Sequence, residues 1–420
     1  MTPLFPPLPA DTRRFLDSLP GLIDEVFPLP LRFRAGLKRD VAELSRLLTA
    51  GREDRGASYL GRPGTLSAYL RYFLPWNIYR LSRLFSGLPL DLKSGDAIND
   101  LGSGPLTLAA ALWISRPDLH SVPLEFRCLD QTAVVLEAGK KFFTALGGDG
   151  SPWTIRTIRA DIKRNGALSA EIRGKPAALS AAVNVYNELF WEFSPVDTDA
   201  LKRFARNQAR LLSSLTEASG SVLVVEPGIP RSGEFISLLR SGLMEQGRQP
   251  LSPCVHTGPC PLPGGRQSAA LHKAGAGAKA KWCHFAFDTE DAPEELRKLS
   301  VAAGLAKERA VLSFILSGPI SSGAGEKREK KDPPKAKPAA ADLPVKVRII
   351  SDAFPVSGNG TREKSSGRDL YGRYGCGGEQ LILVTGSRES IEALPSGALV
   401  KLPLVPGAAD AKSGAAVAEI

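Results

Sequence analysis

From Asp96 onward, short apolar segments alternate with segments of helical periodicity, and this alternation constrains the fold of the 420-residue chain more than any other feature. Such alternation predicts parallel strands joined by helices, and hence a sheet that is covered on both faces. Together, the strands predict a doubly wound α/β domain. We expect six strands, at 97–101, 124–129, 154–160, 178–185, 221–225 and 310–316.

The preceding segment shows helical periodicity instead. Leu37, Val41, Leu44 and Leu48 recur at the spacing of one helix face, so we expect residues 1–94 to form an N-terminal helical region. Within it, the sequence YLRYFLPWN is both aromatic and basic. It either faces RNA or packs on the next domain. Packing is the favoured interpretation, because mixed aromatic and aliphatic helix faces usually belong to a core.

Changes in composition divide the rest of the chain. The segments GGRQSAALHKAGAGAKAK and GEKREKKDPPKAKPAAAD have the composition of flexible insertions or linkers, and KVRIISDAF and EQLILVTG then alternate like strands. The domains predicted after the helical region are an α/β domain at 95–320 with a cysteine-rich loop at 252–285, a disordered charged linker at 321–343, a small β module at 344–405 and a loose tail at 406–420.

A glycine-rich loop that is suited to a ligand follows the first predicted strand. Asp100, Gly102 and Gly104 stand between this strand and a helix expected over 106–114. Glycine permits the tight turn and the close approach of backbone to ligand that such a loop requires. The loop resembles the D-x-G-x-G-x-G motif of class I S-adenosylmethionine-dependent methyltransferases, with Leu106 in place of the third glycine. This resemblance implies that the loop holds the amino-acid part of the cofactor.

Polar residues also follow the next three predicted strands. Asp130 ends the second strand, where an acid can accept hydrogen bonds from both ribose hydroxyls, and Asp161 resembles the acid that meets the adenine amino group. Asn184 follows the fourth strand, on the side of a methyl acceptor. Each residue alone is more often a helix cap or a turn residue. In this order they predict a nucleoside pocket, because open α/β sheets bind ligands at the carboxyl ends of their strands.

The same loop has a competing interpretation as a nicotinamide-dinucleotide site. That site requires G-x-G-x-x-G, whereas the corresponding position here is Thr107. Its ribose acid is also expected about 20 residues further on, and the gap to Asp130 is longer. Both observations disfavour a dinucleotide site.

Four of the five cysteines lie in segments rich in Pro or Gly, or beside the predicted insertion, where a thiol is poorly explained as core filling. Five residues separate Cys254 from Cys260, Cys283 follows the insertion, and Cys376 lies in the β module. Thiolates suit soft metals, either tetrahedral zinc or an iron–sulfur cluster. The spacing is not that of a zinc ribbon and leaves the metal open.

The remaining cysteine and two histidines complete the set of candidates. Cys128 lies in an apolar strand and is expected to be a buried small residue. His256 or His284 in place of one thiol would give a Cys3His zinc site. A metal that bridges both regions would hold the β module to the α/β domain, so its loss should loosen both.

Composition limits the class of protein. Hydrophobic residues make up 43% and charged residues 23% of the chain, which is typical of folded globular proteins. The net charge of +10 favours a polyanionic partner such as RNA, although a basic surface can also serve solubility alone. The sequence shows no apolar run of membrane-spanning length and no signal or transit pattern, so we expect a cytoplasmic protein.

A combination of motifs points to a family. The sequence VVEPGIP, followed by S-P-C-x5-C-P-L and W-C-H-F, resembles the methyltransferase-like assembly factors of the small ribosomal subunit, known from mitochondria and also from bacteria. The resemblance runs from about Arg55 to Leu383. It implies a class I methyltransferase (Rossmann-like) fold with an N-terminal helical region and a C-terminal β extension. It also implies a 4Fe-4S cluster held by Cys254, Cys260, Cys283 and Cys376.

The function that follows is a prediction with stated alternatives. We expect a protein that binds S-adenosylmethionine and small-subunit rRNA, carries an iron–sulfur cluster and assists assembly of the small ribosomal subunit, with no membrane or DNA partner. One alternative is an active rRNA or protein methyltransferase whose metal site is purely structural. Another is a binding module whose cluster gates RNA binding. No motif names a target base, so the sequence assigns no catalytic residue and leaves methyl transfer itself open.

Overall fold

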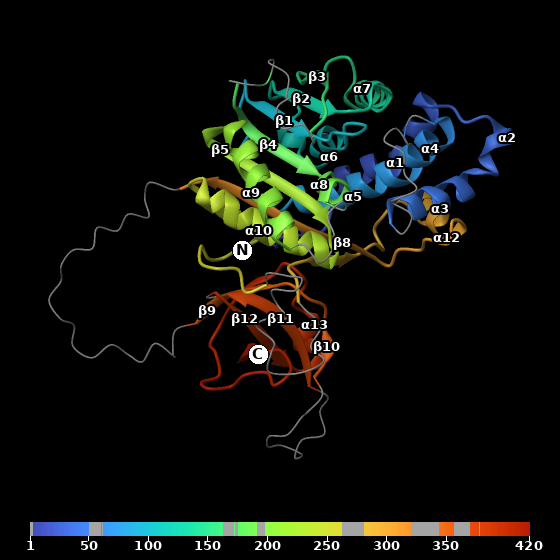
Figure 1. Cartoon of the computed structure of the whole chain (residues 1–420). Helices are drawn as coiled ribbons and strands as arrows, with labels where there is room; N and C mark the ends of the chain where they lie inside the picture. Colours follow the sequence, from blue (N-terminus) through green and yellow to red (C-terminus); the bar gives the residue numbers. More distant parts are fainter. Residues whose placement is uncertain are drawn as a thin grey trace.

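The structure is a computed structural model of the chain, shown in Figure 1. Two sheets lie one above the other in this view, and the N-terminal helices flank the upper one. The residues that the structure describes are 3–49, 60, 62–162, 172, 175–190, 198–262, 281–320, 344–356, 370–377 and 379–420.

The larger sheet has eight strands within these residues, in the order β3-β2-β1-β4-β5-β8-β6, with β7 paired to β8. Strands β1 to β5 pair in parallel, whereas β8 is antiparallel to β5, β6 and β7. A reversed strand between β5 and β6 is the arrangement of class I methyltransferases, and it confirms the predicted fold class. The strands are β1 (Ala97–Leu101), β2 (Glu125–Asp130), β3 (Thr154–Arg159), β4 (Ala177–Val183), β5 (Thr216–Pro227), β6 (Arg248–Ser252), β7 (Phe285–Asp288) and β8 (Arg309–Pro319).

The sequences of the strands explain their places in the sheet. β1 and β4 consist mostly of small and apolar residues, AINDL and AALSAAV, and lie buried at the centre, because helices cover both faces. β3 alternates polar residues with isoleucine, TIRTIR, and lies at one edge, where most of its side chains reach solvent.

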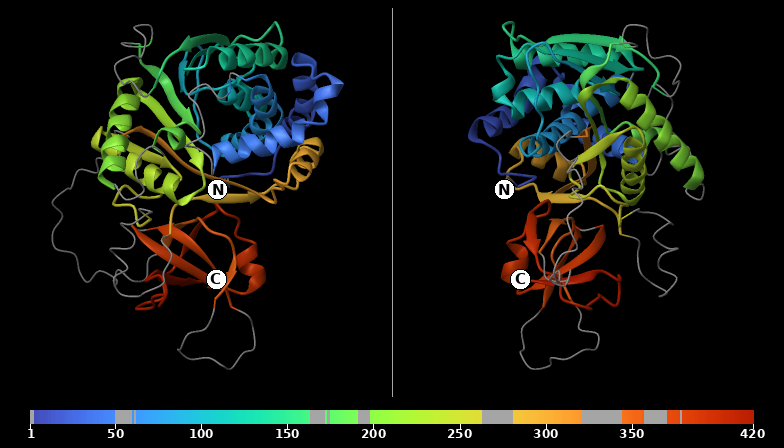
Figure 2. Two further views of the ribbon diagram at one scale, coloured as in Figure 1. Left: turned by 45° about the vertical axis from the view of Figure 1, so that its right-hand side comes forward. Right: turned by 90° about the vertical axis from the view of Figure 1, so that its left-hand side faces the viewer.

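Helices form a layer on each face of this sheet (Figure 2). α6 (Thr107–Ser115) and α7 (Ala133–Gly147) belong to the core on one face, and α9 (Thr198–Ser214) and α10 (Pro230–Glu245) pack together on the other. Every residue of α6 is buried, since TLAAALWIS is apolar on nearly all sides and lies between the sheet and the N-terminal helices. Short helices η4 (Pro117–Leu119), α8 (Tyr186–Leu189) and α12 (Glu294–Ala302) complete this part of the chain.

The N-terminal region is helical, as predicted. Its helix α5 packs on α6, and the run from α4 through η3 to α5 is continuous, with a π-helical turn at η3. Leu70, Tyr72, Leu74 and Trp76 are buried, which confirms packing as the role of the aromatic stretch. The helices are α1 (Ala10–Val26), α2 (Leu31–Arg34), α3 (Leu37–Leu48), α4 (Pro63–Ala68), η3 (Tyr69–Phe73) and α5 (Leu74–Phe85).

The C-terminal part forms a second sheet with its own apolar core. Its order is β13-β9-β11-β12-β14, with β10 paired to β11. A short helix, α13 (Arg388–Glu392), packs on β11 and β12. The strands are β9 (Val345–Ile349), β10 (Phe354–Pro355), β11 (Tyr371–Gly377), β12 (Gln380–Gly386), β13 (Leu399–Leu402) and β14 (Ala416–Glu419).

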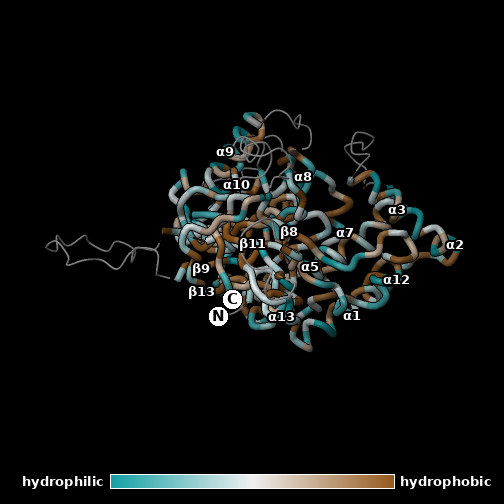
Figure 3. The backbone as a smooth tube through the Cα atoms, turned by 90° about the horizontal axis from the view of Figure 1, so that it is seen from below, coloured by the Kyte–Doolittle hydropathy of each residue, from teal (hydrophilic) through white to brown (hydrophobic). Residues whose placement is uncertain are grey.

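Polar contacts join this sheet to the larger one. Arg309 at the start of β8 forms an ion pair with Asp352, and the amide N–H of Ala286 in β7 donates to Ser396 Oγ over 3.2 Å. Seen from below in Figure 3, strands β9, β11 and β13 of the second sheet overlie the region of β8 and α10. The loop after β6, which carries Cys254, also contacts the second sheet, because Arg348 Nε of β9 donates to the carbonyl of Pro253 at 3.1 Å and Nε2 of His256 lies 3.5 Å from Sγ of Cys376.

The C-terminal residues differ from the predicted organisation. The sequence predicts a loose tail over 406–420, and this is wrong, because β14 pairs in parallel with β12 and Ala418 is fully buried. The short, small-residue sequence AVAE carries little strand signal by itself and is fixed by its partner strand. The predicted linker 321–343 lies outside the described residues, as does nearly all of the predicted insertion 264–281.

Candidate functional site

The glycine loop after β1 adopts a conformation that its glycines make possible. Gly102 and Gly104 have φ values of 73° and 53°, in the left-handed region that favours glycine. A Cβ on Gly102 would lie 2.4 Å from Cγ2 of Val185, so this position excludes any side chain. Leu106, where the motif has its third glycine, also has a positive φ of 59° and is fully buried. The loop thus keeps its left-handed turn at a leucine.

Asp130, at the end of β2, holds this loop in place. Its Oδ2 accepts a hydrogen bond from the amide of Gly104 at 3.1 Å, and its Oδ1 accepts one from the amide of Thr132 at 2.8 Å. Burial raises the pKa of Asp130, and these amide hydrogen bonds oppose the rise. Each carboxylate oxygen has a second lone pair, so Asp130 can still accept hydrogen bonds from a ligand.

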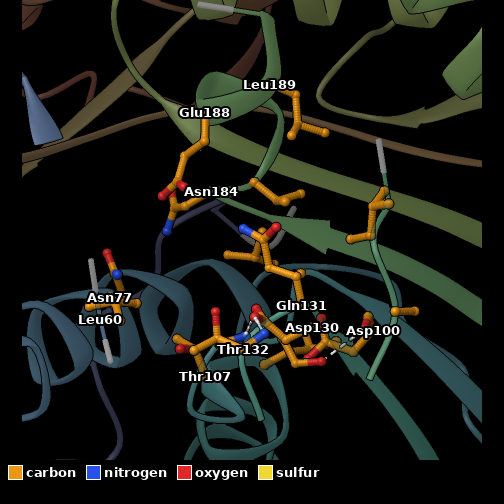
Figure 4. Close-up of a pocket in the computed structure, with 18 of the residues that line it drawn as sticks. Leu60, Asn77, Asp100, Thr107, Asp130, Gln131, Thr132, Asn184, Glu188 and Leu189 are labelled. Atoms are coloured by element: carbon orange, nitrogen blue, oxygen red, sulfur yellow. Dashed lines mark hydrogen bonds between the residues drawn. The ribbon is translucent and has the colours of Figure 1, made fainter. Parts of the chain in front are cut away.

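The structure brings all six predicted cofactor-binding residues onto one pocket. It lies at the carboxyl ends of the parallel strands and contains about 850 Å³ of space not filled by atoms. Figure 4 shows Asp100, Asp130 and Asn184 around this space, together with side chains from the N-terminal region. The six are Asp100, Gly102, Gly104, Asp130, Asp161 and Asn184.

Among these side chains, Asp100 is the one whose charge is least balanced by hydrogen bonds. It is 1% exposed, and neither of its carboxylate oxygens has a hydrogen-bond partner in the part of the chain that the structure describes. Burial, reinforced by the charge of Asp130, raises the pKa of Asp100 to about 8. A buried carboxylate without a partner is unfavourable unless it is protonated or meets a cationic group. The floor of the pocket is therefore suited to a positively charged group of a ligand.

The pocket also has a wall that the sequence did not predict. Leu60, Tyr69 and Asn77 reach it from the N-terminal region. Arg80 of α5 donates to Asn184 Oδ1 at 2.8 Å and to Asn77 Oδ1 at 2.9 Å, which ties this wall to the end of β4. A π-helical turn such as η3 often marks a functional site. No local sequence motif predicts that these residues line the pocket, because only tertiary packing places them here.

A buried carboxylate shapes the loop that follows β4. Glu226, at the end of β5, is fully buried and accepts hydrogen bonds from the amides of Tyr186 and Asn187 at 2.8 and 3.1 Å. The side-chain amide of Asn187 donates to the same carboxylate at 2.9 Å. Burial raises the pKa of Glu226 to about 7. This network fixes the backbone beside Asn184, whose φ is 56°, and so orients the acceptor side of the pocket.

The four cysteines predicted as metal ligands lie in or beside strands of both sheets. Cys254 follows β6, Cys283 precedes β7 and Cys376 lies in β11. Burial raises the pKa of Cys283, and the charges of Cys254, Cys260 and Cys376 raise it further. Within the described residues, no three His, Cys, Asp or Glu side chains form a group that could hold a metal ion, so the structure does not assemble the predicted metal site.

The other sulfur and imidazole groups fall into separate roles. Cys128 is fully buried in β2, as predicted for a small core residue. The Nε2 atom of His256 lies 3.5 Å from Sγ of Cys376, whereas His284 stacks on Trp282 at 4.7 Å and makes a 3.1 Å hydrogen bond with its carbonyl. Of these two histidines, His256 contacts Cys376, one of the four cysteines predicted as metal ligands.

Comparisons with known proteins find likeness only at the level of structure. No protein-family model matches the chain, and no curated protein matches its sequence. No helix within the described ranges is both long and apolar enough to span a membrane.

Solved methyltransferases resemble the fold. A putative class I S-adenosylmethionine-dependent methyltransferase from Listeria monocytogenes is 9% identical, with a TM-score of 0.34 over 78% of this chain and 90% of that one. A putative methyltransferase from Bacillus halodurans is 11% identical, with a TM-score of 0.30 over 58% of this chain and 99% of that one. A chain of the complex between the Haloferax volcanii Trm112 methyltransferase activator and a putative methyltransferase is 10% identical, with a TM-score of 0.31 over 66% of this chain and 98% of that one. The fold assignment rests on the strand order itself.

Proposed function

We propose that this chain binds S-adenosylmethionine in the pocket at the strand ends, carries a 4Fe-4S cluster on four of its cysteines, and binds small-subunit rRNA to assist assembly of the small ribosomal subunit. The pocket itself is the main support for binding of this cofactor. Its predicted residues come from the ends of successive parallel strands and meet in one space, with an unpartnered carboxylate at its floor.

The residues present fit S-adenosylmethionine. Asp100 would pair with the ammonium group of the methionine part, since its oxygens are buried and unpartnered. Gly104 leaves room for its backbone to approach the ligand, since a side chain there would meet only Tyr69 Oη at 3.9 Å, and Gly102 permits the left-handed turn before it. Asp130 would accept from the ribose hydroxyls with its remaining lone pairs, and Asp161 would meet the adenine amino group.

The chemistry of this pocket would be positioning. When bound, the cofactor supplies a methyl group already activated by its sulfonium. The chain contributes a wall that includes Tyr69 and Asn77, and an acceptor side where Arg80 holds Asn184 and the carboxylate of Glu226 holds the neighbouring Asn187. Alignment of an acceptor with the methyl group is enough to accelerate transfer.

The iron–sulfur cluster is supported by the type of donor and by the family resemblance of the cysteine motifs. Four thiols are the donor set that holds a 4Fe-4S cluster, and tetrahedral zinc is bound by the same kind of donor. As they stand, the described side chains form no group that could hold a metal ion. Tetrahedral zinc is the alternative occupant.

RNA as the partner is supported by charge and by the resemblance of the Glu-Pro-Gly and cysteine motifs. The net charge is +10, and α9 presents Lys202, Arg203 and Arg210 to solvent on its outer face. Lysine and arginine on one face provide the phosphate contacts of RNA-binding proteins, and the affinity should fall steeply as salt concentration rises.

A second candidate function is active methylation of rRNA or protein, with the metal site purely structural. The polar acceptor side of the pocket, formed by Asn184 and Glu188, favours it. Incubation with radiolabelled S-adenosylmethionine and small-subunit RNA or particles separates the two functions. Salt-sensitive RNA binding without methyl transfer supports the assembly factor. Transfer that is lost in Asp100→Ala supports the enzyme, and absence of both RNA binding and transfer contradicts both.

The cofactor at the cysteines is tested by anaerobic purification with iron, sulfide and zinc analysis. About four irons and four sulfides per chain, with broad visible absorption that is lost in Cys254→Ser, are expected. Cys128→Ser is the matched control, because Cys128 lies in β2 and should leave the metal content unchanged. Stoichiometric zinc without sulfide would show that the cysteines hold a structural zinc ion and not an iron–sulfur cluster.

A further inference from the structure

A tyrosine hydroxyl from the N-terminal region faces the glycine loop. Tyr69 begins the π-helical turn η3 and lines the strand-end pocket. Its Oη lies 3.9 Å from the position that a Cβ on Gly104 would occupy. The ring of Tyr69 stacks on that of Phe73, with 5.7 Å between the ring centroids, which fixes the direction of the hydroxyl. Tyr69 therefore presents a hydroxyl to the region proposed above for the amino-acid part of the cofactor.

The charges around this pocket make one group of the cofactor difficult to bind. Four carboxylates line it, those of Asp100, Asp130, Asp161 and Glu188, and none of the described lining residues is a lysine or an arginine. The carboxylates suit the ammonium and sulfonium groups of S-adenosylmethionine. They repel its carboxylate, which needs hydrogen-bond donors when it leaves water. Uncharged donors must therefore bind this group.

The hydroxyls of two residues lie next to the glycine loop. Within the loop itself, Ser103 Oγ donates to a backbone carbonyl at 2.9 Å, and the amide of Gly104 donates to Asp130 at 3.1 Å, so these two donors are already engaged. Tyr69 on the N-terminal wall and Thr107 at the start of α6 line the same pocket. The hydroxyl of Tyr69 is distinguished by the side chains that support it.

Arg80 and Asn77 orient this hydroxyl. A guanidinium group can only donate hydrogen bonds, so the 2.9 Å bond from Arg80 Nη2 fixes Oδ1 of Asn77 on the side of Arg80. Burial and the charges of Glu188 and Asp130 raise the pKa of the tyrosine, so its phenol stays protonated near neutral pH. A hydrogen bond with Asn77 opposes this rise in pKa, as a bond donated to the phenol oxygen does. Tyr69 thus accepts from the amide nitrogen of Asn77 and can donate its own hydrogen to a ligand.

We propose that Tyr69 binds the carboxylate of the methionine part of S-adenosylmethionine, with Asn77 and Arg80 as positioning residues. This inference rests on the cofactor proposed above. The ammonium and carboxylate groups are bonded to the same carbon atom, so Asp100 on the floor and Tyr69 on the N-terminal wall bind them from two sides. In Figure 4, Asn77 lies across the pocket from Asp100. The N-terminal region thereby makes the pocket selective for ligands that carry the complete amino-acid part.

The test is calorimetric titration of the full chain with two ligands, S-adenosylmethionine and its decarboxylated form, which lacks only the carboxylate. Tyr69→Phe should weaken binding of S-adenosylmethionine about tenfold, because a hydrogen bond to a charged group is lost. The same variant should leave the affinity for the decarboxylated form unchanged. Asn77→Ala should show the same selectivity with a smaller loss. Tyr72→Phe is the matched control and should change neither affinity, because its hydroxyl, in the same turn, donates to the carbonyl of Leu305 at 3.2 Å.

The outcomes separate this inference from the cofactor on which it rests. A wild type that does not bind S-adenosylmethionine overturns both. A wild type that binds it, together with a Tyr69→Phe variant of unchanged affinity, overturns the inference alone. Equal losses for the two ligands would also overturn it, because the hydroxyl would then act on the shape of the pocket and not on the carboxylate.

Two further variants close the remaining possibilities. A selective loss in Thr107→Val, with none in Tyr69→Phe, would assign the carboxylate to the start of α6 and overturn the role of Tyr69. Circular dichroism identifies a variant that fails to fold. If Tyr69→Phe is such a variant, the selectivity of Asn77→Ala decides, and equal affinities of Asn77→Ala and the wild type for S-adenosylmethionine overturn the inference.

Discussion

At the scale of the residue, the proposed cofactor site depends on side chains whose charge no other group of the chain balances, or whose backbone conformation is unfavourable. Asp100 is the clearest of these, because its carboxylate is buried and unpartnered among the described residues. Burial and Asp130 raise its pKa to about 8, whereas an unfolded aspartate titrates near 3.9. Between these values the folded chain binds a proton that the unfolded chain has released. The contribution of Asp100 to stability is therefore lost as pH rises from about 4 to about 8.

Asp100→Asn should remove this pH dependence and weaken S-adenosylmethionine binding about tenfold or more, since a hydrogen bond to a charged group contributes about 1.5–3 kcal/mol. Urea unfolding at several pH values and calorimetric titration measure the two effects. Asp118→Asn, at an exposed ion pair with Arg116, is the control. A variant that keeps both the slope and the affinity would show that Asp100 does not face the ligand.

Sequence reasoning could locate residues that stand at strand ends, and it could not locate those placed by packing. Asp100, Asp130 and Asn184 could be predicted because a parallel sheet brings its carboxyl ends to one edge. Tyr69 and Asn77 could not, because their helices approach that edge only through long-range packing. Arg240 has the sequence context of an ordinary helix residue, and only the folded chain brings its guanidinium to the carbonyl of His256, at 2.9 Å.

At the scale of the element, the glycine loop is the segment with the least tolerance. Gly102→Ala should destabilise the fold by about 2–5 kcal/mol, the sum of left-handed backbone strain and a clash with Val185. Gly95→Ala has a positive φ of 89° but open space around it, and should cost only about 1–2 kcal/mol. Equal losses in urea unfolding would mean that contact with Val185 does not shape the loop.

The last strand gives a second prediction at this scale. Removing residues 415–420 deletes β14, with buried Ala415 and Ala418, from the edge of the second sheet. Thermal unfolding should show a loss of about 1–3 kcal/mol. Lys412→Ala, at an exposed position of the preceding turn, should have no measurable effect. An unchanged melting temperature after truncation would restore the sequence-based expectation of a loose tail.

Elements with long apolar runs were predictable, and short ones were not. β1, β4, β5 and β8 were expected close to their observed places, because burial on both faces leaves a nearly continuous apolar signal. β2 and β3 were also expected, from their places in the alternation of strands and helices rather than from a long apolar run. β6 and β7 were missed. Each has only a few residues and borders the cysteine-rich loop, and β6 contains Pro250. Their strand conformation comes from pairing with β8.

At the scale of the whole molecule, the four cysteines proposed as metal ligands come from both sheets. Cys254, Cys260 and Cys283 border β6 and β7 of the larger sheet, whereas Cys376 belongs to β11 of the second. A metal held by all four would link units that otherwise share contacts such as the Arg309–Asp352 ion pair. Removal of the metal should therefore raise hydrogen exchange in β9, β11 and the loop after β6, and leave α1 unchanged. Exchange that rises everywhere, or nowhere, would contradict a local link between the sheets.

Calorimetric titration of the folded chain with S-adenosylmethionine decides whether the strand-end pocket binds this cofactor. We predict one site per chain, with affinity reduced about tenfold or more in both Asp100→Asn and Asp130→Ala and unchanged in Asp118→Asn. Absence of binding to the folded wild type, or equal affinity in all four proteins, would contradict the assignment of the strand-end pocket as the cofactor site.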